Sequence, residues 1–415
     1  MLPGQPSVSF KQYGGYVAIN ESLGQHFYYY FVETIKPNNS SPLVIWFNGG
    51  PGCSSLQGAF KEHGPFRVHS DGKTLYRNPY SWNQETNVLY IESPAGIGFS
   101  YTNPPSDLEH IGDKKTAEAN YVFLVKWLER FPEYKGRDVY ITGQSYAGHY
   151  CPQLAQLILH NKNQTFINLR GVLIGNPGID ELTEEKGKYE YLFNHALISQ
   201  KTYDDYQTFC VNSSKGVCAD AIYSVYFQVE QTIDMYNIYA PKCLNSTLTS
   251  KPKKYTTVKN FDPCSATYLA AYLNQANVQK AMHANTTKLP YEWNECDFNI
   301  NFLWSANDRH NSITPILKEL MDNGVRVLVY SGDMDAHVSF TSTMSVLRNM
   351  NLTVEKIWRP WFSEGEVGGY TEEYKNNFIY ATVRGAGHSV PSDQPIRAFT
   401  LFTSFIHNTP LPDTL

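Results

Sequence analysis

Long apolar runs are absent from this sequence. No stretch of its 415 residues approaches the roughly 18 uncharged apolar residues that a membrane-spanning helix requires. The N-terminal segment MLPGQPSVSF also lacks the apolar core of a signal peptide. We therefore expect a soluble chain from which any targeting segment has already been removed.

An excess of positive charge is also missing. Lys and Arg together number 34 against 39 Asp and Glu, so the formal net charge is -5 at pH 7. Such a chain has no surplus of cations to neutralise nucleic-acid phosphates or to attract anionic lipids. Nucleic-acid and membrane partners are therefore not expected. The apolar fraction of 42% is ordinary for a globular protein with a sizeable core.

Cysteine is scarce, but its number is informative. Seven cysteines are an odd number, so at least one thiol has no partner within the chain. Eight N-glycosylation sequons accompany them. Together these features favour the oxidising secretory route, with a secreted or a vacuolar or lysosomal destination. The sequons begin at Asn20, Asn38, Asn39, Asn163, Asn212, Asn245, Asn285 and Asn351.

Short β-branched and aromatic runs recur along the chain and end in Gly, Pro, Ser or Asp, which is typical of buried strands. They occupy residues 43–50, 88–96, 138–145, 171–178 and 325–333. Helical patterns at 117–131 and 312–324 alternate with them, which predicts an α/β fold with a mostly parallel sheet and helices on both faces. Functional groups are expected beyond the carboxyl ends of the strands, where such sheets bind ligands.

The alternation of strands and helices stops between about residues 180 and 300. Polar and aromatic residues mix there with Cys210, Cys218, Cys243 and Cys264, and KPKKYTTVK at 251–259 has the character of an exposed basic loop. We interpret residues 180–300 as a disulfide-stapled, mainly helical insertion above the active edge of the sheet. Residues 1–179 and 301–415 would then form the core.

The segment DVYITGQSYAGHY contains the first candidate catalytic residue. It has the pattern of a strand, a tight turn and a helix, with Ser145 in the turn. Gly143 and Ala147 are small enough to let strand and helix approach closely, which would hold Ser145 in the strained conformation of a nucleophile elbow. A serine that merely caps the following helix would show the same local pattern, so the motif needs partners elsewhere.

A serine hydroxyl is a weak nucleophile and requires a base that is oriented by a carboxylate. The segment SGDMDAHV places Asp333 and Asp335 just after a strand, and GAGHSVPSDQP places His388 in a glycine-rich turn. An aspartate after a strand is more commonly a turn residue. The order Ser145, Asp335, His388 is nevertheless that of α/β-hydrolases. We predict these three residues as a catalytic triad on an α/β-hydrolase fold, with Asp333 as the alternative carboxylate.

The oxyanion that forms after nucleophilic attack needs preorganised donors, which are usually backbone amides. The amide of Tyr146, directly after the serine, is one candidate. The other is the amide of Gly50 in NGGPG, a run that follows a buried strand and would elsewhere be an ordinary surface turn. No cofactor or metal is expected for this chemistry.

Five motifs occur in order over nearly the whole chain: NGGPGCSS, ESPAGIGFSY, GxSYAGHY, SGDxD and GAGHxVPxDQP. Together they resemble the serine carboxypeptidases, and longer stretches resemble the plant two-chain type in particular. The resemblance implies release of C-terminal amino acids from peptides through an acyl-enzyme on Ser145. It also implies a free thiol at Cys151 and the pairs Cys53 with Cys296, Cys210 with Cys218, and Cys243 with Cys264.

The resemblance further implies a site for the C-terminal carboxylate of the substrate. In such enzymes the NGG segment and two glutamates that share a proton bind this group, and the matching residues are Asn48, Gly49, Glu62 and Gln144. Gln144 departs from the expected acid. An amide donates a hydrogen bond at every pH, whereas two adjacent acids lose their shared proton as the pH rises. The change either widens the pH range or marks a site that is adapted to another substrate.

The function stays open between related activities on a peptide or a small ester. Exopeptidase action is the leading expectation, acyl transfer from a sugar ester is the alternative, and hydroxynitrile cleavage is less favoured. The segment AHVSF after Asp335 and the residue Ser389 after His388 also depart from the family pattern. A catalytically inactive binding protein is disfavoured because the triad is complete. The sequence leaves open the side-chain preference, cleavage within 251–259, and the oligomeric state, with a homodimer among the alternatives.

Overall fold

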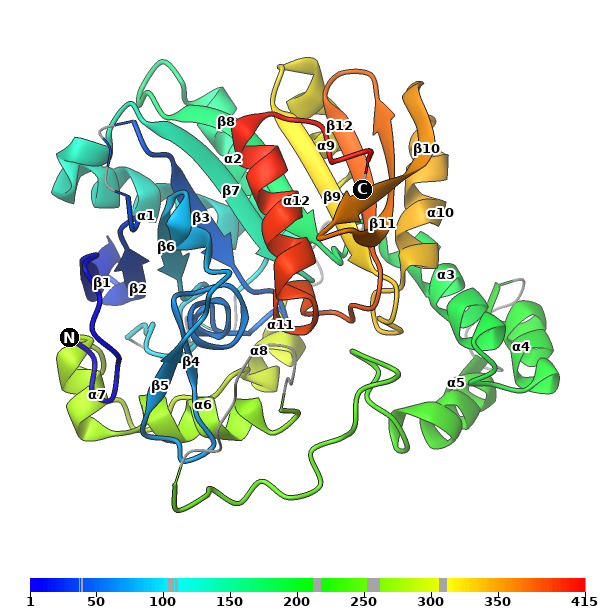
Figure 1. Cartoon of the computed structure of the whole chain (residues 1–415), viewed down its shortest axis with the longest axis horizontal. Coiled ribbons are helices and arrows are strands. Elements are labelled where there is room, and N and C mark those ends of the chain that lie inside the picture. Colours follow the sequence, from blue (N-terminus) through cyan, green and yellow to red (C-terminus); the bar gives the residue numbers. More distant parts are fainter. Residues whose placement is uncertain are drawn as a thin grey trace.

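The structure is a computed structural model that describes residues 1–36, 38, 40–103, 108, 111–211, 218–251, 262–305 and 312–414. The basic loop predicted at 251–259 falls outside these ranges except for its first residue, as do Asn39 and Asn212 of the predicted sequons. Figure 1 shows the whole chain, with a central sheet flanked by helices.

A ten-stranded sheet forms the centre of the molecule, in the order β1-β2-β6-β3-β7-β8-β9-β12-β11-β10. All neighbours from β6 to β12 run parallel, and both ends of the sheet are antiparallel. The strands are β1 (Gln12–Asn20), β2 (Gln25–Val32), β3 (Leu43–Phe47), β6 (Asn87–Ile91), β7 (Asp138–Gln144), β8 (Asn168–Gly175), β9 (Arg326–Gly332), β10 (Val354–Ser363), β11 (Glu366–Tyr374) and β12 (Phe378–Val383). A separate hairpin pairs β4 (Phe66–Val68) with β5 (Leu75–Arg77).

Alternating side chains of the central strands enter two different cores, because successive residues of a strand point to opposite faces. In β3, Leu43, Ile45 and Phe47 pack on one face, and Val44 and Trp46 pack on the other. Burial on both faces explains why the parallel strands read as continuous apolar runs in the sequence.

Helices cover both faces of the sheet. The first core includes side chains of α1 (Asp113–Arg130), α2 (Ala147–His160), α9 (Thr314–Asp322) and α10 (Phe340–Met350). The second includes side chains of α12 (Pro395–His407), which crosses the sheet in red in Figure 1, and of α6 (Ser265–Leu273) and α7 (Ala276–Ala281). This architecture confirms the predicted α/β-hydrolase fold, with a helical segment between β8 and β9.

The residues predicted as one insertion pack in two places. The helices α3 (Glu181–Asn194), α4 (Gln200–Tyr206) and α5 (Cys218–Val225) lie to one side of the sheet in Figure 1 and contribute to a third, small core. In contrast, α6 and α7 join the second core of the sheet. Shorter helices complete the described fold: α8 (Phe298–Leu303), α11 (Val390–Asp393), η1 (Gly58–Glu62), η2 (Trp82–Gln84), η4 (Pro132–Tyr134), η5 (Gln207–Val211) and η6 (Tyr226–Glu230).

Three disulfide bonds are present, and they are the pairs that the family resemblance implies: Cys53–Cys296, Cys210–Cys218 and Cys243–Cys264. Cys151 on α2 is a buried free thiol. Of the described sequon residues, Asn285 is half-buried, and the exposed ones are Asn20, Asn38, Asn163, Asn245 and Asn351. Within the described ranges, no helix is both long enough and apolar enough to span a membrane.

Candidate active site

Ser145 lies in the turn between β7 and α2, at the carboxyl end of a central strand. Its φ of 61° is in the left-handed region, which a residue other than glycine rarely adopts. The turn is tight, because a Cβ atom on Gly143 would come within 2.6 Å of Ala147 Cβ and 2.7 Å of the Phe47 carbonyl oxygen. The small residues around Ser145 therefore create the strained elbow that the motif predicts.

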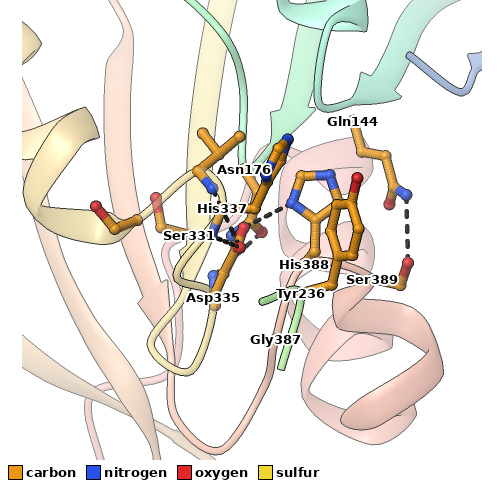
Figure 2. Close-up of polar contacts among 12 residues, drawn as sticks. Gln144, Asn176, Tyr236, Ser331, Asp335, His337, Gly387, His388 and Ser389 are labelled. Carbon is orange, nitrogen blue, oxygen red and sulfur yellow. Dashed lines mark hydrogen bonds and ion pairs between the residues drawn. The ribbon is translucent and has the colours of Figure 1, made fainter. Parts of the chain in front are cut away.

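Asp335 and His388 meet beside this elbow, one after β9 and the other after β12 (Figure 2). His388 Nδ1 lies 2.6 Å from Asp335 Oδ2, and the two side chains are 6% and 0% exposed. The carboxylate is held by further donors: Asn176 Nδ2 donates to Oδ2 at 2.8 Å, and two backbone amides donate to Oδ1. With His388 Nδ1 donating to this carboxylate, Nε2 is left to exchange protons.

Asp333, the alternative carboxylate, has a different role in the fold. Its Oδ1 accepts a hydrogen bond from the Gly385 amide at 2.7 Å, which connects the turn after β9 to the turn after β12. Burial raises the pKa of Asp333, and hydrogen bonds from backbone amides oppose the shift. The geometry therefore places Asp335 rather than Asp333 against the histidine.

Two residues at this site were not singled out from the sequence. Asn176 follows β8 and links Asp335 to the end of β9, because its Oδ1 accepts the Gly332 amide at 3.2 Å while its Nδ2 donates to Asp335. The sequence could have indicated Asn176, because it is a polar residue at the carboxyl end of a predicted strand.

Tyr236 comes from the segment between α5 and α6, where no local pattern in the sequence indicated a role at this site. Its carbonyl accepts the His388 amide at 2.7 Å, and its ring centroid lies 5.0 Å from that of His388.

The glycine-rich loop after β3 packs directly against the elbow. A Cβ atom on Gly49 would come within 2.3 Å of the Tyr146 amide nitrogen, so only glycine permits this approach. Gly50 follows with a φ of 112° and lines the same cavity as Ser145. The Tyr146 hydroxyl donates to the buried Asp113 at 2.8 Å, which anchors the residue after Ser145. The two predicted oxyanion donors, the Gly50 and Tyr146 amides, thus belong to segments in contact.

Asn48 holds a fixed orientation in the expected carboxylate site. Its Oδ1 accepts from Trp46 Nε1 at 2.6 Å and from the Gly58 amide at 3.1 Å, so its Nδ2 must donate elsewhere. Nδ2 donates to Glu62 Oε1 at 2.8 Å, and Glu62 Oε2 has no hydrogen-bond partner among the described residues. Burial raises the pKa of Glu62 to about 7, against the opposing effect of the Asn48 hydrogen bond. Glu62 is therefore a buried acid that keeps its proton in acidic solution.

Gln144 is the last residue of β7, directly before Ser145, and is 4% exposed. Its Nε2 donates to Ser389 Oγ at 3.3 Å (Figure 2), whereas Oε1 has no hydrogen-bond partner within the described part of the chain. No described hydrogen bond joins Gln144 to Glu62. The Gln144 amide therefore contacts Ser389, the residue after His388, while its oxygen is available to accept a further hydrogen bond.

These groups converge on one cavity of about 280 Å³. Ser145, His388, Gln144, Asn48 and Gly49 line it, whereas Glu62 contacts it through Asn48. The remaining wall combines charged residues with aromatic rings and the Cys53–Cys296 disulfide: Gly50, Cys53, Gln57, Lys61, Asp234, Tyr236, Asn237, Ala240, Pro263, Glu295, Cys296, Phe298, His337, Ser389 and Asp393.

Comparison with known proteins identifies the family of this chain. The model of the serine carboxypeptidase family matches residues 3–408. Serine carboxypeptidase-like 36 of Arabidopsis thaliana is 63% identical over 417 residues, which cover 100% of this chain and 86% of that protein. Serine carboxypeptidase 24 of the same plant is 43% identical over 435 residues, which cover 99% of this chain and 92% of that protein.

Among solved structures, a prohormone-processing carboxypeptidase from Saccharomyces cerevisiae is similar in fold. The TM-score is 0.80 with 23% sequence identity, and the alignment covers 98% of this chain and 94% of the yeast protein. The family model extends over nearly the whole chain, and the two plant relatives align with 99% or more of it. The chain belongs to the serine carboxypeptidase family.

Proposed function

We propose that this protein is a serine exopeptidase that releases the C-terminal residue of a peptide through an acyl-enzyme on Ser145. The observation that carries the proposal is the pairing of Asn48 with the protonatable Glu62 at the cavity of the nucleophile elbow. A protonated acid and an amide are groups that bind a carboxylate without repelling it. A carboxylate held there would place the last peptide bond of a substrate at the elbow.

In the first half of the proposed reaction, Ser145 Oγ attacks the carbonyl carbon of the last peptide bond. His388 Nε2 takes the hydroxyl proton, and Asp335 stabilises the imidazolium through Nδ1. The Gly50 and Tyr146 amides would stabilise the negative charge on the carbonyl oxygen. The carbon–nitrogen bond then breaks, His388 passes its proton to the leaving amine, and the acyl group stays on Ser145.

In the second half, water replaces the departed amino acid. His388 takes a proton from the water as it attacks the acyl carbon, and returns that proton to Ser145 Oγ when the ester bond breaks. The products are the shortened peptide and a free amino acid. The same intermediate would yield an ester or an amide if an alcohol or amine attacked in place of water.

Acyl transfer from a sugar ester is the second candidate, and one observation favours it. Gln144 Oε1 is buried in the cavity with no partner among the described residues, and an amide oxygen accepts hydrogen bonds. A sugar hydroxyl would satisfy it, whereas a carboxylate has no proton to donate. For the exopeptidase, the amide must instead rotate so that its NH2 group faces the substrate.

Labelling and product analysis together separate the two candidates. The native protein and Ser145→Ala are incubated with a serine-directed phosphonate, and then with a blocked dipeptide or with a 1-O-acyl glucose ester plus an alcohol. An exopeptidase is labelled at Ser145 and releases the free amino acid, and Ser145→Ala does neither. Consumption of the glucose ester with formation of a new ester, while the dipeptide stays intact between pH 4 and 8, would replace the proposal with the transferase.

We also infer that the protein folds on the secretory route. The three disulfide bonds support this, because such bonds persist in oxidising compartments. The exposed positions of Asn20, Asn38, Asn163, Asn245 and Asn351 are compatible with glycosylation there. Digestion with a glycosidase, followed by mass measurement of protein purified from its native source, tests the inference.

A further inference from the structure

A second pair of aspartate and histidine lies beside the nucleophile elbow, and the proposed mechanism does not use it. His149 Nδ1 lies 3.1 Å from Asp113 Oδ2, and the two residues are 5% and 0% exposed. Because an ionised carboxylate only accepts hydrogen bonds, Nδ1 is the donor. Polar groups of this kind are costly to bury, and here they are buried around Tyr146, the residue that follows Ser145.

Asp113 joins the first turn of α2 to two other parts of the chain. Its Oδ1 accepts from the Tyr146 hydroxyl at 2.8 Å and from Trp304 Nε1 at 3.1 Å, while its Oδ2 accepts from His149. Asp113 is the first residue of α1, where the positive end of the helix dipole favours a carboxylate. Trp304 directly follows α8. The start of α2 is therefore connected to the start of α1 and to the end of α8.

The ring of Tyr146 packs against three other aromatic rings. His149 stacks on it, with the ring planes 4° apart and the centroids 4.4 Å apart. Tyr150 and Trp304 meet it edge-on, each with its centroid 5.6 Å away. The side chain of Tyr146 is thus held at its hydroxyl by Asp113 and across its face by His149.

The backbone of Tyr146 is confined from the other side. Its angles are helical, at φ -60° and ψ -13°, directly after the left-handed Ser145. Gly49 packs on this backbone, because a Cβ atom on Gly49 would lie 2.3 Å from the Tyr146 nitrogen and 2.9 Å from the Ala147 nitrogen. The Tyr146 amide therefore lies between the glycine-rich loop and its own anchored side chain. A donor stabilises an oxyanion well only when it is held in place before the reaction.

We propose that Asp113 and His149 are positioning residues that hold the Tyr146 amide at the site of the oxyanion. The inference rests on the proposed acyl-enzyme chemistry of Ser145, and it applies whether water or an alcohol completes the reaction. Neither residue is among the described residues that line the cavity. Asp113 acts through the Tyr146 hydroxyl, and His149 acts through its ring and through Asp113. This role needs an acceptor atom at Asp113 rather than a negative charge.

Tyr146→Phe tests the inference, because it removes the hydroxyl and keeps the ring and the amide. We expect kcat for a blocked dipeptide to fall about ten- to one hundredfold. KM should stay within about threefold, because the bound substrate does not yet carry an oxyanion. Tyr13→Phe is the matched control, since the Tyr13 hydroxyl donates to Glu33 Oε1 at 3.0 Å from the edge strand β1. The control should keep the native kcat.

Two changes of Asp113 separate position from charge. Asp113→Asn keeps an oxygen for Tyr146 and Trp304, and its NH2 group can donate to His149 Nδ1 once the imidazole proton moves to Nε2. This variant should stay within about fivefold of the native kcat. Asp113→Ala has no acceptor, so its kcat should fall at least as far as that of Tyr146→Phe. Melting temperatures report whether each variant folds, and Tyr146→Phe carries the test if Asp113→Ala does not.

The affinity for a blocked amino aldehyde reports the oxyanion site directly. Ser145 Oγ adds to the aldehyde carbon, the hydroxyl proton passes to His388, and the carbonyl oxygen becomes the oxyanion of a hemiacetal without any leaving group. We expect the inhibition constant of the aldehyde to rise in Tyr146→Phe by the factor by which kcat/KM falls. A role in folding alone would lower the melting temperature and leave this constant unchanged, which would overturn the inference.

The outcomes also separate this inference from the function on which it rests. If the native protein neither reacts with the phosphonate nor binds the aldehyde, the acyl-enzyme proposal and the inference both fail. If it cleaves the dipeptide while folded Tyr146→Phe keeps the native kcat or the native aldehyde affinity, the inference is overturned and the exopeptidase proposal stands. If it only transfers acyl groups between esters, the exopeptidase proposal fails and the aldehyde affinities decide the inference. Parallel losses in Tyr146→Phe, with activity kept in Asp113→Asn, support it.

Discussion

The hydrogen bonds of Asp335 provide the sharpest test of the proposed triad. Its Oδ1 accepts the backbone amides of His337 at 2.8 Å and Val338 at 3.1 Å. Its Oδ2 accepts from Asn176 and from His388. In Asp335→Asn the amide oxygen must remain on the side of the two backbone donors, because an NH2 group accepts no hydrogen bond. The new NH2 group then faces His388 Nδ1.

An NH2 group at this position reverses the tautomer of the histidine. His388 Nδ1 must accept a hydrogen bond, so its proton moves to Nε2, and that nitrogen can no longer take the proton of Ser145. We expect kcat to fall about 10⁴-fold, which corresponds to ~5.4 kcal/mol of transition-state stabilisation. The new NH2 group also faces Asn176 Nδ2, which is itself a donor, so one hydrogen bond of Asn176 is lost. The free energy of unfolding should therefore fall by about 1–3 kcal/mol.

Asp333→Asn is the matched control, because it makes the same chemical change two residues away in the same turn. Asp333 contacts the Gly385 amide and not the histidine, so its variant should stay within about tenfold of the native kcat. The rate of phosphonate labelling at Ser145 and the dipeptide kcat are measured for both variants, and the melting temperature reports folding. A well-folded Asp335→Asn that retains native activity would refute the reasoning, as would a larger loss in Asp333→Asn.

Three further predictions concern Gln144, the left-handed φ of Ser145 and three buried glutamates. Gln144→Glu places a second acid near Glu62, so KM for a blocked dipeptide should rise roughly five- to fiftyfold between pH 5 and pH 7.5 as the proton is lost. The native KM should rise less over that range, and parallel pH profiles of the two forms would contradict the assignment. Ser145→Gly should raise the free energy of unfolding by roughly 1–3 kcal/mol, because glycine adopts the left-handed φ without strain. Ser145→Ala should lose phosphonate labelling without that gain, and equal melting temperatures of the two variants would remove the strain argument. Burial raises the pKa of Glu62, Glu92 and Glu184 to about 7. These three acids therefore bind more protons in the folded than in the unfolded state between about pH 4.5 and 7, so their contribution to stability should fall as the pH rises through this window. Burial lowers the pKa of His63, His69 and His337, which has the opposite effect, so the melting temperature of the native protein is compared with that of Glu92→Gln from pH 5 to pH 7. The same pH dependence in both forms would show that Glu92 is not protonated in the fold.

The central strands and the elbow were predictable because their signals are local. The strands predicted at 43–50, 88–96, 138–145, 171–178 and 325–333 overlap β3, β6, β7, β8 and β9. Their apolar runs reflect burial on both faces of the sheet, which is typical of parallel strands covered by helices. The turn at Ser145 was equally predictable from the sequence, because the small residues Gly143 and Ala147 permit the close packing of β7 on α2.

The antiparallel ends of the sheet were not predicted as strands. Both β1 and β10 are edge strands, and the exposed residues of β10 include Ile357 and Trp358. Without burial on both faces such strands have no continuous apolar run, and their place depends on neighbours that are distant in the chain. The sequence also did not show that residues 180–300 divide between two cores, because this division depends on which helices contact the sheet.

The sequence by itself determined five of the parallel strands, the elbow and Ser145 within it, because each depends on residues within a few positions of one another. Only the tertiary structure decided which aspartate meets His388. Asp333 and Asp335 share one turn and one chemistry, and their difference arises from where Gly385, Asn176 and His388 lie in space. The cavity beside Ser145 likewise exists only in the fold, because lining residues such as Asn48, Tyr236 and His388 are far apart in the chain and are brought together where the loops after the parallel strands meet the insertion.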